Sequence, residues 1–257
     1  MPGAPIERTF DKLSVRIFAN QAELAASACS DATRILSETI AQRGEANFMV
    51  ATGNAGLQFM AALRQASGID WSKINLFHMD EYVGISAQHP ASFRRFIHQY
   101  LSDAVKPGAA YYLEGDAPDA QAECQRYAGL LHQHPIDLCH CGIGENGHLA
   151  FNDPPVADFA DPLVVKVVAL DQACRQQQVG EGHFPALAAV PTHALTVTIP
   201  ALLAARRIIA VVPEKRKAKA VYEALYGPLD TSCPASMLRR QSHAVLYLDR
   251  DSAQLLF

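Results

Sequence analysis

The chain has 257 residues, of which 49% are hydrophobic and 19% charged, and it carries a formal net charge of −4. This composition excludes a disordered chain, a collagen-like fibre and a disulfide-stapled miniprotein, and no run of about 18 apolar residues indicates a membrane span. The acidic balance argues against a nucleic-acid partner but allows a small anionic substrate, because a local basic pocket can form in an acidic protein.

Along the chain, apolar residues alternate between the spacing of strands and that of helices. Strands are expected at residues 13–18, 47–52, 74–79, 136–142, 194–199, 207–212 and 244–248. Helices are expected at residues 22–41, 53–65, 91–101, 120–132 and 215–225. This order predicts an α/β fold, a three-layer αβα sandwich whose Rossmann-like, mostly parallel sheet has helices on both faces. No repeat or linker interrupts the pattern, so we expect a single domain over residues 1–257.

Six cysteines are spread over the chain: Cys29, Cys124, Cys139, Cys141, Cys174 and Cys233. The first residues show no secretion signal and a chain of this length needs no disulfide staples, so we expect free thiols in a cytoplasmic protein. Cys139 and Cys141 would face the same side of a strand, as ligands of one metal ion must, but no second pair of ligands accompanies them. We therefore interpret both as buried apolar side chains.

Polar and glycine-rich segments follow four of the predicted strands directly. They are Thr52-Gly53-Asn54, Asp80-Glu81-Tyr82, Gly142 to His148, and Pro213 to Lys217. In open parallel sheets, ligands bind beyond the carboxyl ends of the strands. The placement therefore predicts one site to which all four segments contribute.

The segment from Gly142 to Gly147 matches the Gly-x-Gly-x-x-Gly pattern of dinucleotide-binding proteins. That function needs a helix to begin at the loop, whereas Pro154 and Pro155 leave room for only about two turns. We interpret the segment as a glycine loop that lets the backbone approach a ligand. His148, at its end, is a candidate acid or base at neutral pH; the alternative is a histidine that only binds the loop backbone.

Two other kinds of segment suggest proton transfer and anion binding. Asp80 follows an apolar strand, where a carboxylate can take a proton from carbon next to a carbonyl; an inert acidic turn is the alternative. The turn from Thr52 to Gly56 precedes a predicted helix, whose N–H groups and dipole favour an anion. The three cations Lys215 to Lys217 stand at another helix start, where an anion would offset their conflict with the dipole. We therefore expect a phosphate-binding pocket.

At these residues the sequence resembles the glucosamine-6-phosphate deaminase/6-phosphogluconolactonase family, over about residues 48–252. The resemblance rests on Phe-His-Met-Asp-Glu-Tyr-Val-Gly at 77–84 and on Gly-x-Gly-x-x-Gly-His-Leu-Ala-Phe-Asn-x-Pro at 142–154. The Ala-Phe-Asn continuation after the Gly-His pair is similar to the deaminase branch, because the lactonase branch typically continues with Ala-Ser-Leu-Phe-Pro.

The resemblance implies a three-layer α/β fold and action on a 2-amino-2-deoxy hexose 6-phosphate. The ring opens, the C2 proton moves, and the amino sugar becomes a ketose as ammonia leaves. Asp80 matches the family's proton-abstracting aspartate, His148 its ring-opening histidine and Lys217 a phosphate-binding lysine. The phosphate loop is matched by Thr52, Gly53, Asn54 and Ala55.

The remaining expected site residues are Glu145, Asn146 and Asp153 in the catalytic group, and Glu81, Gly144 and Arg175 around the substrate. The resemblance implies no metal and no organic cofactor. It implies a small sugar phosphate as partner, with neither nucleic acid nor membrane, and a homo-oligomer is compatible with it.

The sequence departs from the family pattern at positions that bear on the site. The family usually has aspartate at the position of Asn146 and glutamate at that of Asp153. An amide can orient a histidine but adds no charge, so we expect Glu145 to substitute or His148 to lack a charged partner. Gly182 occupies the expected position of a phosphate-contacting arginine, for which Arg175 is the candidate replacement.

The residues leave two alternatives to a deaminase open. A 6-phosphogluconolactonase-type enzyme would use His148 as the base that activates water and would need no transfer of a C2 proton. A non-catalytic sugar-phosphate sensor would account for the altered site positions, but the residues before Leu13 are too few for the DNA-binding helices of such regulators.

Overall fold

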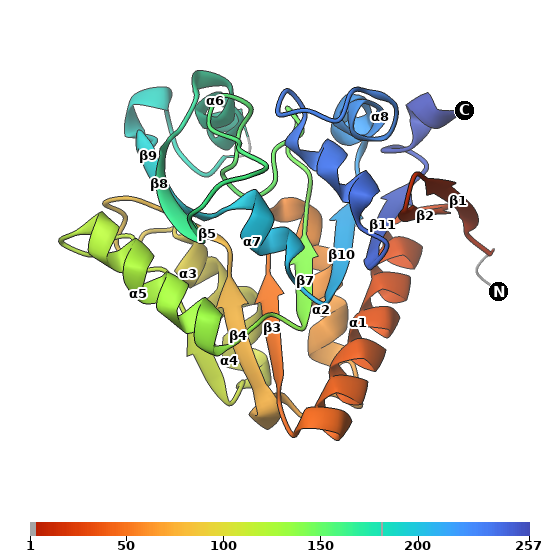
Figure 1. The fold of residues 1–257 in the computed structure, drawn as a ribbon, viewed down its shortest axis with the longest axis horizontal. Helices are drawn as coiled ribbons and strands as arrows, with labels where there is room; N and C mark the ends of the chain where they lie inside the picture. Colours follow the sequence, from red (N-terminus) through yellow and green to blue (C-terminus); the bar gives the residue numbers. More distant parts are fainter. Residues whose placement is uncertain (1–3, 181) are drawn as a thin grey trace.

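An eight-stranded sheet organises the chain in the computed structural model, which describes residues 4–180 and 182–257 (Figure 1). In spatial order its strands are β1 (Ile6–Phe10), β2 (Leu13–Phe18), β11 (Ala244–Asp249), β10 (Arg207–Val212), β7 (Leu138–Cys141), β3 (Ala46–Val50), β4 (Ile74–His78) and β6 (Ala109–Tyr111). Neighbouring strands pair in parallel, except that β1 runs antiparallel to β2. The carboxyl ends of the parallel strands therefore meet at one edge, which lies below α6 and α8 in Figure 1.

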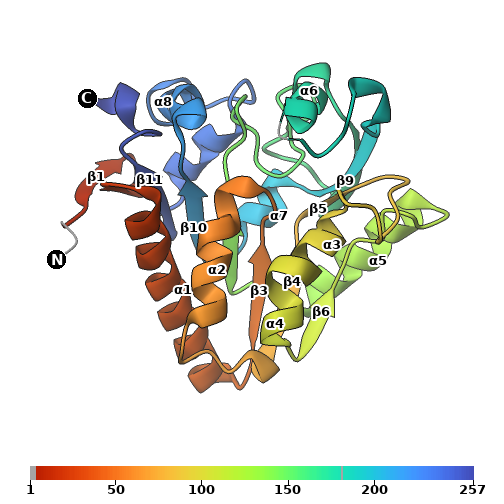
Figure 2. The same cartoon turned by 180° about the vertical axis from the view of Figure 1, so that it is seen from behind.

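Helices cover both faces of this sheet, which confirms the predicted three-layer α/β sandwich. One face carries α1 (Gln21–Arg43), α2 (Leu57–Gln65), α3 (Phe93–Ile97) and α4 (Asp103–Val105), as Figure 2 shows. The other carries α5 (Ala120–Gln133), α7 (Ile199–Leu203) and α8 (Ala218–Tyr226). Successive side chains of a strand point to opposite faces of the sheet and so pack in both layers. On β3, Phe48 and Val50 pack toward α1 and α2, whereas Met49 joins the cluster on the opposite face.

A second, smaller sheet was not expected from the sequence. It consists of β5 (Asp80–Tyr82), β9 (His193–Val197) and β8 (Val165–Ala169), which pair antiparallel in that order. The strand expected at residues 194–199 thus belongs to this sheet rather than to the parallel one, and Ile199 already begins α7. Apolar alternation indicates that a segment is extended but does not specify which strand it pairs with.

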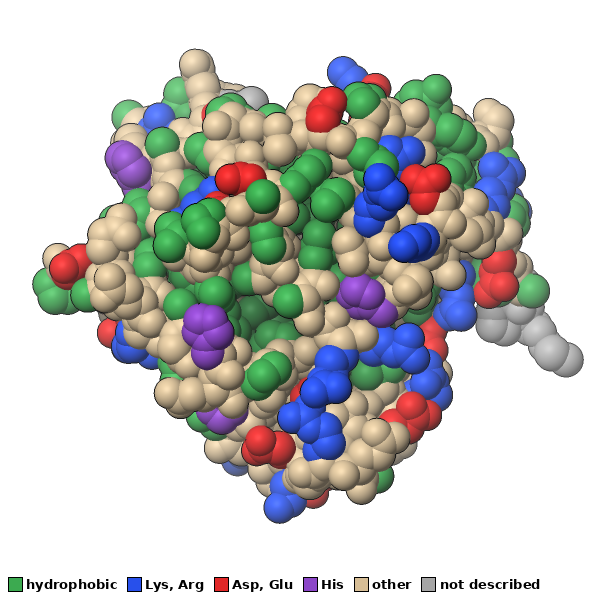
Figure 3. Space-filling view, viewed as in Figure 1, with side chains coloured by type: hydrophobic (Ala, Val, Ile, Leu, Met, Phe, Trp, Pro, Cys, Tyr) green, Lys and Arg blue, Asp and Glu red, His purple; other side chains and the backbone are tan. Residues whose placement is uncertain are grey.

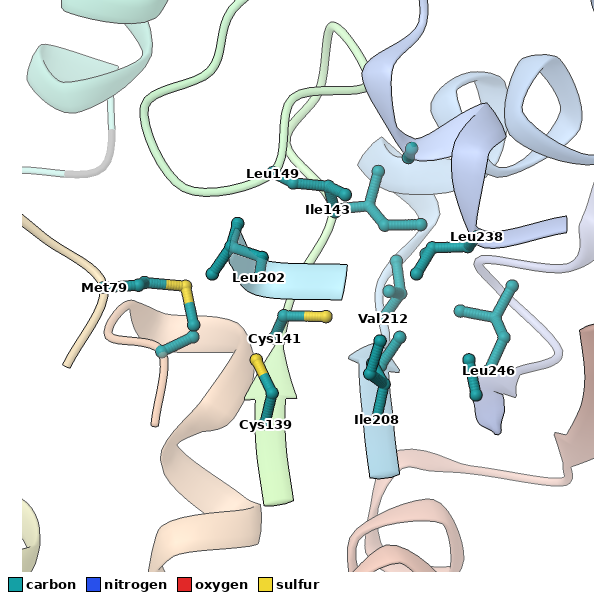
Figure 4. Close-up of a cluster of buried hydrophobic side chains, with 14 of the residues drawn as sticks. Met79, Cys139, Cys141, Ile143, Leu149, Leu202, Ile208, Val212, Leu238 and Leu246 are labelled. Carbon is teal, nitrogen blue, oxygen red and sulfur yellow. The ribbon is translucent and has the colours of Figure 1, made fainter. Parts of the chain in front are cut away.

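The cysteines lie inside the protein as free thiols, as the composition predicts. All six are buried and none is paired. Cys139 and Cys141 belong to the hydrophobic cluster of Figure 4, together with Met79. His140 points to the opposite face of β7 and stacks on Phe59, with ring centroids 4.3 Å apart. The Cys-His-Cys segment is therefore core, and its interpretation as apolar packing is confirmed.

The face that carries α5 and α7 mixes acidic, basic and hydrophobic side chains (Figure 3). Some of the surface charges compensate buried ones: Arg43 and Arg206 both form ion pairs with Asp137, which is 1% exposed. Among residues 4–180 and 182–257, no helix is both long and apolar enough to cross a bilayer.

Candidate active site

The candidate site lies at the carboxyl edge of the sheet, where the strand order reverses. From β3 the chain continues outward through β4 and β6, whereas from β7 it continues in the opposite direction through β10 and β11. The loops that leave β3 and β7 therefore diverge and open a crevice, the usual ligand position in such sheets. The pocket in this crevice is lined by eight of the expected site residues: Thr52, Gly53, Asn54, Ala55, Asp80, Gly144, His148 and Lys217.

Asp80 enters the pocket because the chain changes sheets beside it. Strand β4 ends at His78, Met79 forms the link, and β5 begins at Asp80; the N–H of Val197 donates to the Met79 carbonyl at 2.8 Å and fixes the junction. The Asp80 residue is only 7% exposed, and its buried Oδ1 accepts no hydrogen bond from any residue that the structure describes. Burial first, and then the charges of Glu81 and Asp153, raise the pKa of Asp80 well above its usual value.

Two side chains, Asn146 and Asp153, orient His148. The Asn146 amide donates to Asp153 Oδ1 at 2.8 Å, and Asn146 Oδ1 accepts from the His148 N–H at 3.1 Å. The same Asp153 oxygen lies 2.8 Å from His148 Nδ1. Burial raises the pKa of Asp153, but the hydrogen bonds and charge from His148 and Asn146 outweigh it, so this pKa lies below its usual value. Because an ionised carboxylate only accepts, Nδ1 carries the proton, and Nε2 is the acceptor nitrogen of the neutral ring.

This arrangement corrects the expectation about the partner of His148. Asp153, not Glu145, is the carboxylate at the ring, and Asn146 holds that carboxylate in place. Glu145 turns away and pairs with Arg216 at 3.3 Å. The departure at position 146 therefore leaves His148 with a charged partner.

The loop before His148 is shaped by its glycines. A β-carbon at Gly144 would lie 2.3 Å from the His148 ring, so the imidazole packs directly against the loop backbone. Gly147 has φ 85°, a left-handed conformation that favours glycine. The next helix after the loop in the described chain is α6 (Gln172–Gly180), so no helix begins at the loop itself. The geometry agrees with a glycine loop and not with a dinucleotide fingerprint.

The opposite part of the pocket suits an anion. A 3₁₀ turn at Asn54–Gly56 leads into α2, after Gly53 with φ 105°. A second 3₁₀ turn, Lys215–Lys217, leads into α8 and brings Lys217, only 5% exposed, and Arg216 to the same pocket. Two helix starts and two cations thus converge, which favours a phosphate group.

Two residues expected around the substrate do not line the pocket. Glu81 is fully buried at the start of α3, where it accepts hydrogen bonds from Ser92 Oγ at 2.8 Å and from the N–H groups of Phe93 and Arg94 at 3.1 and 2.9 Å. Burial raises the pKa of Glu81, although these hydrogen bonds oppose the shift. Glu81 thus caps α3 and does not face the substrate.

Arg175 is the second of these residues. Its guanidinium donates to the carbonyl oxygens of Leu187 and Val190 at 2.7 and 2.9 Å and so ties α6 to the following loop. The structure therefore does not support Arg175 as the replacement for the arginine expected at Gly182.

The comparisons with known proteins agree with this geometry. The model of the family described as "Glucosamine-6-phosphate isomerases/6-phosphogluconolactonase" matches residues 19–247. The chain belongs to this family. It is 36% identical over 214 residues to the glucosamine-6-phosphate deaminase of Listeria innocua, which covers 83% of this chain and 89% of that protein. The deaminase of Exiguobacterium sibiricum is also 36% identical, over 207 residues and 80% of each chain.

Solved structures of this family resemble the fold as a whole. A monomeric glucosamine-6-phosphate deaminase superposes with a TM-score of 0.84 and 31% identity, covering 94% of this chain and 99% of that one. A 6-phosphogluconolactonase from Shewanella baltica superposes with a TM-score of 0.77, covering 96% and 100% of the two chains. Its identity of 19% supports the shared fold alone.

Several pocket residues were missed by sequence reasoning. They are Met79, Phe93, Phe151, Gln177, Gln178, His183 and Arg216. Signals were present for three of them: Met79 and Phe151 stand within the segments that carry the family resemblance, and Arg216 stands within the predicted cation cluster. The residues from α6 and the loop after it had no such signal, because the stretch between residues 156 and 190 carries no family motif that anchors it.

Proposed function

We propose that the protein is a glucosamine-6-phosphate deaminase, which opens the ring of an amino-sugar phosphate, isomerises it to fructose 6-phosphate and releases ammonia. One observation carries the proposal: Asp80 and the His148–Asp153 pair flank a single pocket whose lining also includes Lys217. The relatives that are 36% identical over most of both chains are named for this activity.

The phosphate group would occupy the turn from Thr52 to Ala55 opposite Lys217, where helix N–H groups and cations converge. With the phosphate held there, the sugar lies between His148 and Asp80. His148 accepts the C1 hydroxyl proton at Nε2 and returns it to the ring oxygen as the C1–O5 bond breaks. Asp153 keeps the imidazole in the tautomer that this step needs.

Asp80 then acts as the base at C2. Three buried acids lie close together, yet two already have donors: Glu81 has the start of α3, and Asp153 has His148 and Asn146. Asp80 Oδ1 has no donor among the described residues, and the Asp80 residue lines the pocket.

The charge around Asp80 favours an amino sugar over a lactone. Burial and the neighbouring acids raise the pKa of Asp80, which makes its carboxylate a strong base but disfavours the charged form. An ammonium group at C2 would offset that cost, whereas a neutral lactone offers no such cation. Removal of the C2 proton gives an enolamine; a proton returned to C1 leaves an imine at C2, and water hydrolyses that imine to release ammonia and leave the ketose.

The experiment is a pair of assays on purified protein with glucosamine 6-phosphate. Ammonia and ketose phosphate measure turnover, and exchange of the C2 hydrogen with solvent deuterium measures the proposed step. Asp80→Asn should abolish C2 exchange and lower kcat by about 10²–10⁴-fold while KM changes little. Asp251→Asn, the same change at an exposed position, is the control.

Other outcomes would replace the proposal. Hydrolysis of a sugar-phosphate lactone without C2 exchange would indicate a lactonase. Phosphate-dependent binding of the sugar without turnover would indicate a sensor.

We also propose that residues 1–257 act as one cytoplasmic domain without a nucleic-acid partner. The support is that one pocket draws on segments from Thr52 to Lys217 and that the net charge is negative.

A further inference from the structure

A cluster of three different ligand types includes His148, the carboxylate that orients it and a cysteine. His148, Asp153 and Cys174 each offer one atom, and these atoms all lie within 4.8 Å of one another. The first two come from the loop after β7, and Cys174 comes from the first turn of α6. Imidazole nitrogen, carboxylate oxygen and thiolate sulfur are the ligands that Zn²⁺ takes in proteins, and three of them plus a water complete its tetrahedron.

The spacing is close to that of a zinc site. Zinc–ligand distances of about 2.0–2.3 Å place tetrahedral ligand atoms about 3.5 Å apart, so side-chain adjustments of about 1 Å suffice. Both sides of the cluster are held in place: the Cys174 N–H donates to Asp171 at 2.8 Å, and Asn146 holds Asp153 Oδ1.

One oxygen of the Asp153 carboxylate has no strong hydrogen-bond donor in the described part of the chain. Its Oδ2 is buried, and no nitrogen or hydroxyl group of the described residues donates to it. The Cys174 thiol, a weak donor, lies beside the same carboxylate. A buried carboxylate oxygen without a strong donor is costly, and a cation would satisfy it.

The cluster lies between two hollows. His148 lines the substrate pocket, whereas Cys174 lines an adjacent hollow together with Glu145 and Asn146; Gln177 and Arg216 line both. The cluster therefore borders a hollow on its Cys174 side as well as the substrate pocket. Glu145 lines this hollow but is paired with Arg216, so the charge that favours a cation at the cluster is that of Asp153 itself.

We propose that His148 Nδ1, Asp153 and Cys174 bind Zn²⁺ and that this binding inhibits the enzyme. The inhibition, but not the binding, rests on the proposed function. Ligation through Nδ1 displaces the ring proton to Nε2, so the nitrogen that accepts the sugar's proton is lost. The Cys174 thiol releases its proton to solvent as the Zn–S bond forms. Without the metal, burial and the Asp153 charge raise the pKa of Cys174 and keep the thiol protonated.

Binding is tested first, without reference to activity. Co²⁺ is titrated into the reduced, metal-free protein, and the near-ultraviolet band of thiolate-to-cobalt charge transfer is recorded; Zn²⁺ is then added in competition. We expect the band to saturate at one equivalent and zinc to abolish it. Cys174→Ser should remove the band and weaken zinc binding by at least about 10-fold, because even partners outside the ligand shell contribute about 10–100-fold. Cys29→Ser, a buried cysteine on α1, is the matched control and should keep both.

Circular dichroism establishes that each variant is folded, and Asp153→Asn provides a second variant in which the zinc affinity must also fall. A wild-type protein without the band, or a band that persists in Cys174→Ser, overturns the site. If the band behaves as expected but one equivalent of zinc leaves turnover unchanged in an active enzyme, the inhibitory role is wrong. If the protein turns over no hexosamine phosphate at all, the proposed function fails while the binding result stands.

Discussion

The contact between Gly144 and His148 makes a sharp test of the proposed ring-opening step. In Gly144→Ala the new β-carbon would lie 2.3 Å from the imidazole Cε1 and Nε2 and 2.4 Å from Nδ1. Ordinary contacts begin at 3.4 Å, so the ring must move by about 1.1 Å, the difference between 3.4 and 2.3 Å. A misplacement of about 1 Å costs about 10²-fold in rate. We therefore expect kcat to fall about 100-fold, or about 2.7 kcal/mol in activation free energy.

The measurement separates this displacement from general damage. Steady-state assays of ammonia release should show the loss in kcat with KM within about 3-fold, because the phosphate segments after β3 and β10 are not touched. C2 deuterium exchange from pre-opened sugar should fall much less than turnover, since Asp80 stays in place. Overpacking also costs about 1–3 kcal/mol of stability, so urea unfolding establishes that the variant is folded in the assay.

Gly142→Ala is the matched control in the same loop. Its β-carbon would meet only the Val211 carbonyl oxygen, at 3.8 Å, which is an ordinary contact. We expect its kcat to lie much closer to that of the wild type. The reasoning is refuted if Gly144→Ala keeps kcat within about 3-fold, or if both variants lose the same amount.

Two further predictions concern stability. Glu81→Ala should lower the free energy of unfolding by about 2–4 kcal/mol, because Ser92, Phe93 and Arg94 lose a buried acceptor; a loss below about 1 kcal/mol in urea titration would contradict the capping role. Burial lowers the pKa of His140 from 6.5 to about 3. Below pH 6.5 the unfolded chain therefore binds a proton at this histidine and the native state does not, so the free energy of unfolding falls. Between about pH 7 and pH 5 this one group contributes a loss of about 2 kcal/mol, which His140→Leu should remove. Equal pH-dependent losses in wild type and variant would refute it.

The layers of the fold could be predicted because the parallel strands are short, mostly apolar runs that are buried on both faces of the sheet. The strands β2 and β10 have the bounds that their apolar pattern predicts, Leu13–Phe18 and Arg207–Val212. The strands β5 and β6 have three residues each, which is too short to establish a period. Strand pairing depends on partners far along the chain, so the antiparallel sheet could not be separated from the parallel one.

The candidate site could be located from the sequence, but its internal contacts could not. Chemistry-bearing segments follow β3, β4, β7 and β10, and the position of a ligand beyond such strands is a property of the sheet. The partner of His148 is different in kind. Glu145 and Asp153 stand three and five residues from it in opposite directions, and either is near enough to reach the ring. The turn after His148 decides between them: Ala150 has φ 52° and Asn152 bridges back to Leu149, which brings the next residue under the imidazole.

Arg216 is the partner of Glu145, the acid that does not contact His148. It pairs with Glu145 at 3.3 Å and with Glu214 at 2.5 Å while lining the pocket beside Lys217. Glu145, which the sequence suggested as the partner of His148, thus positions Arg216 at the anion-binding part of the site. Composition and spacing are the same whichever acid contacts the histidine. Only the folded turn reveals that Asp153 serves the proton transfer and Glu145 the anion site.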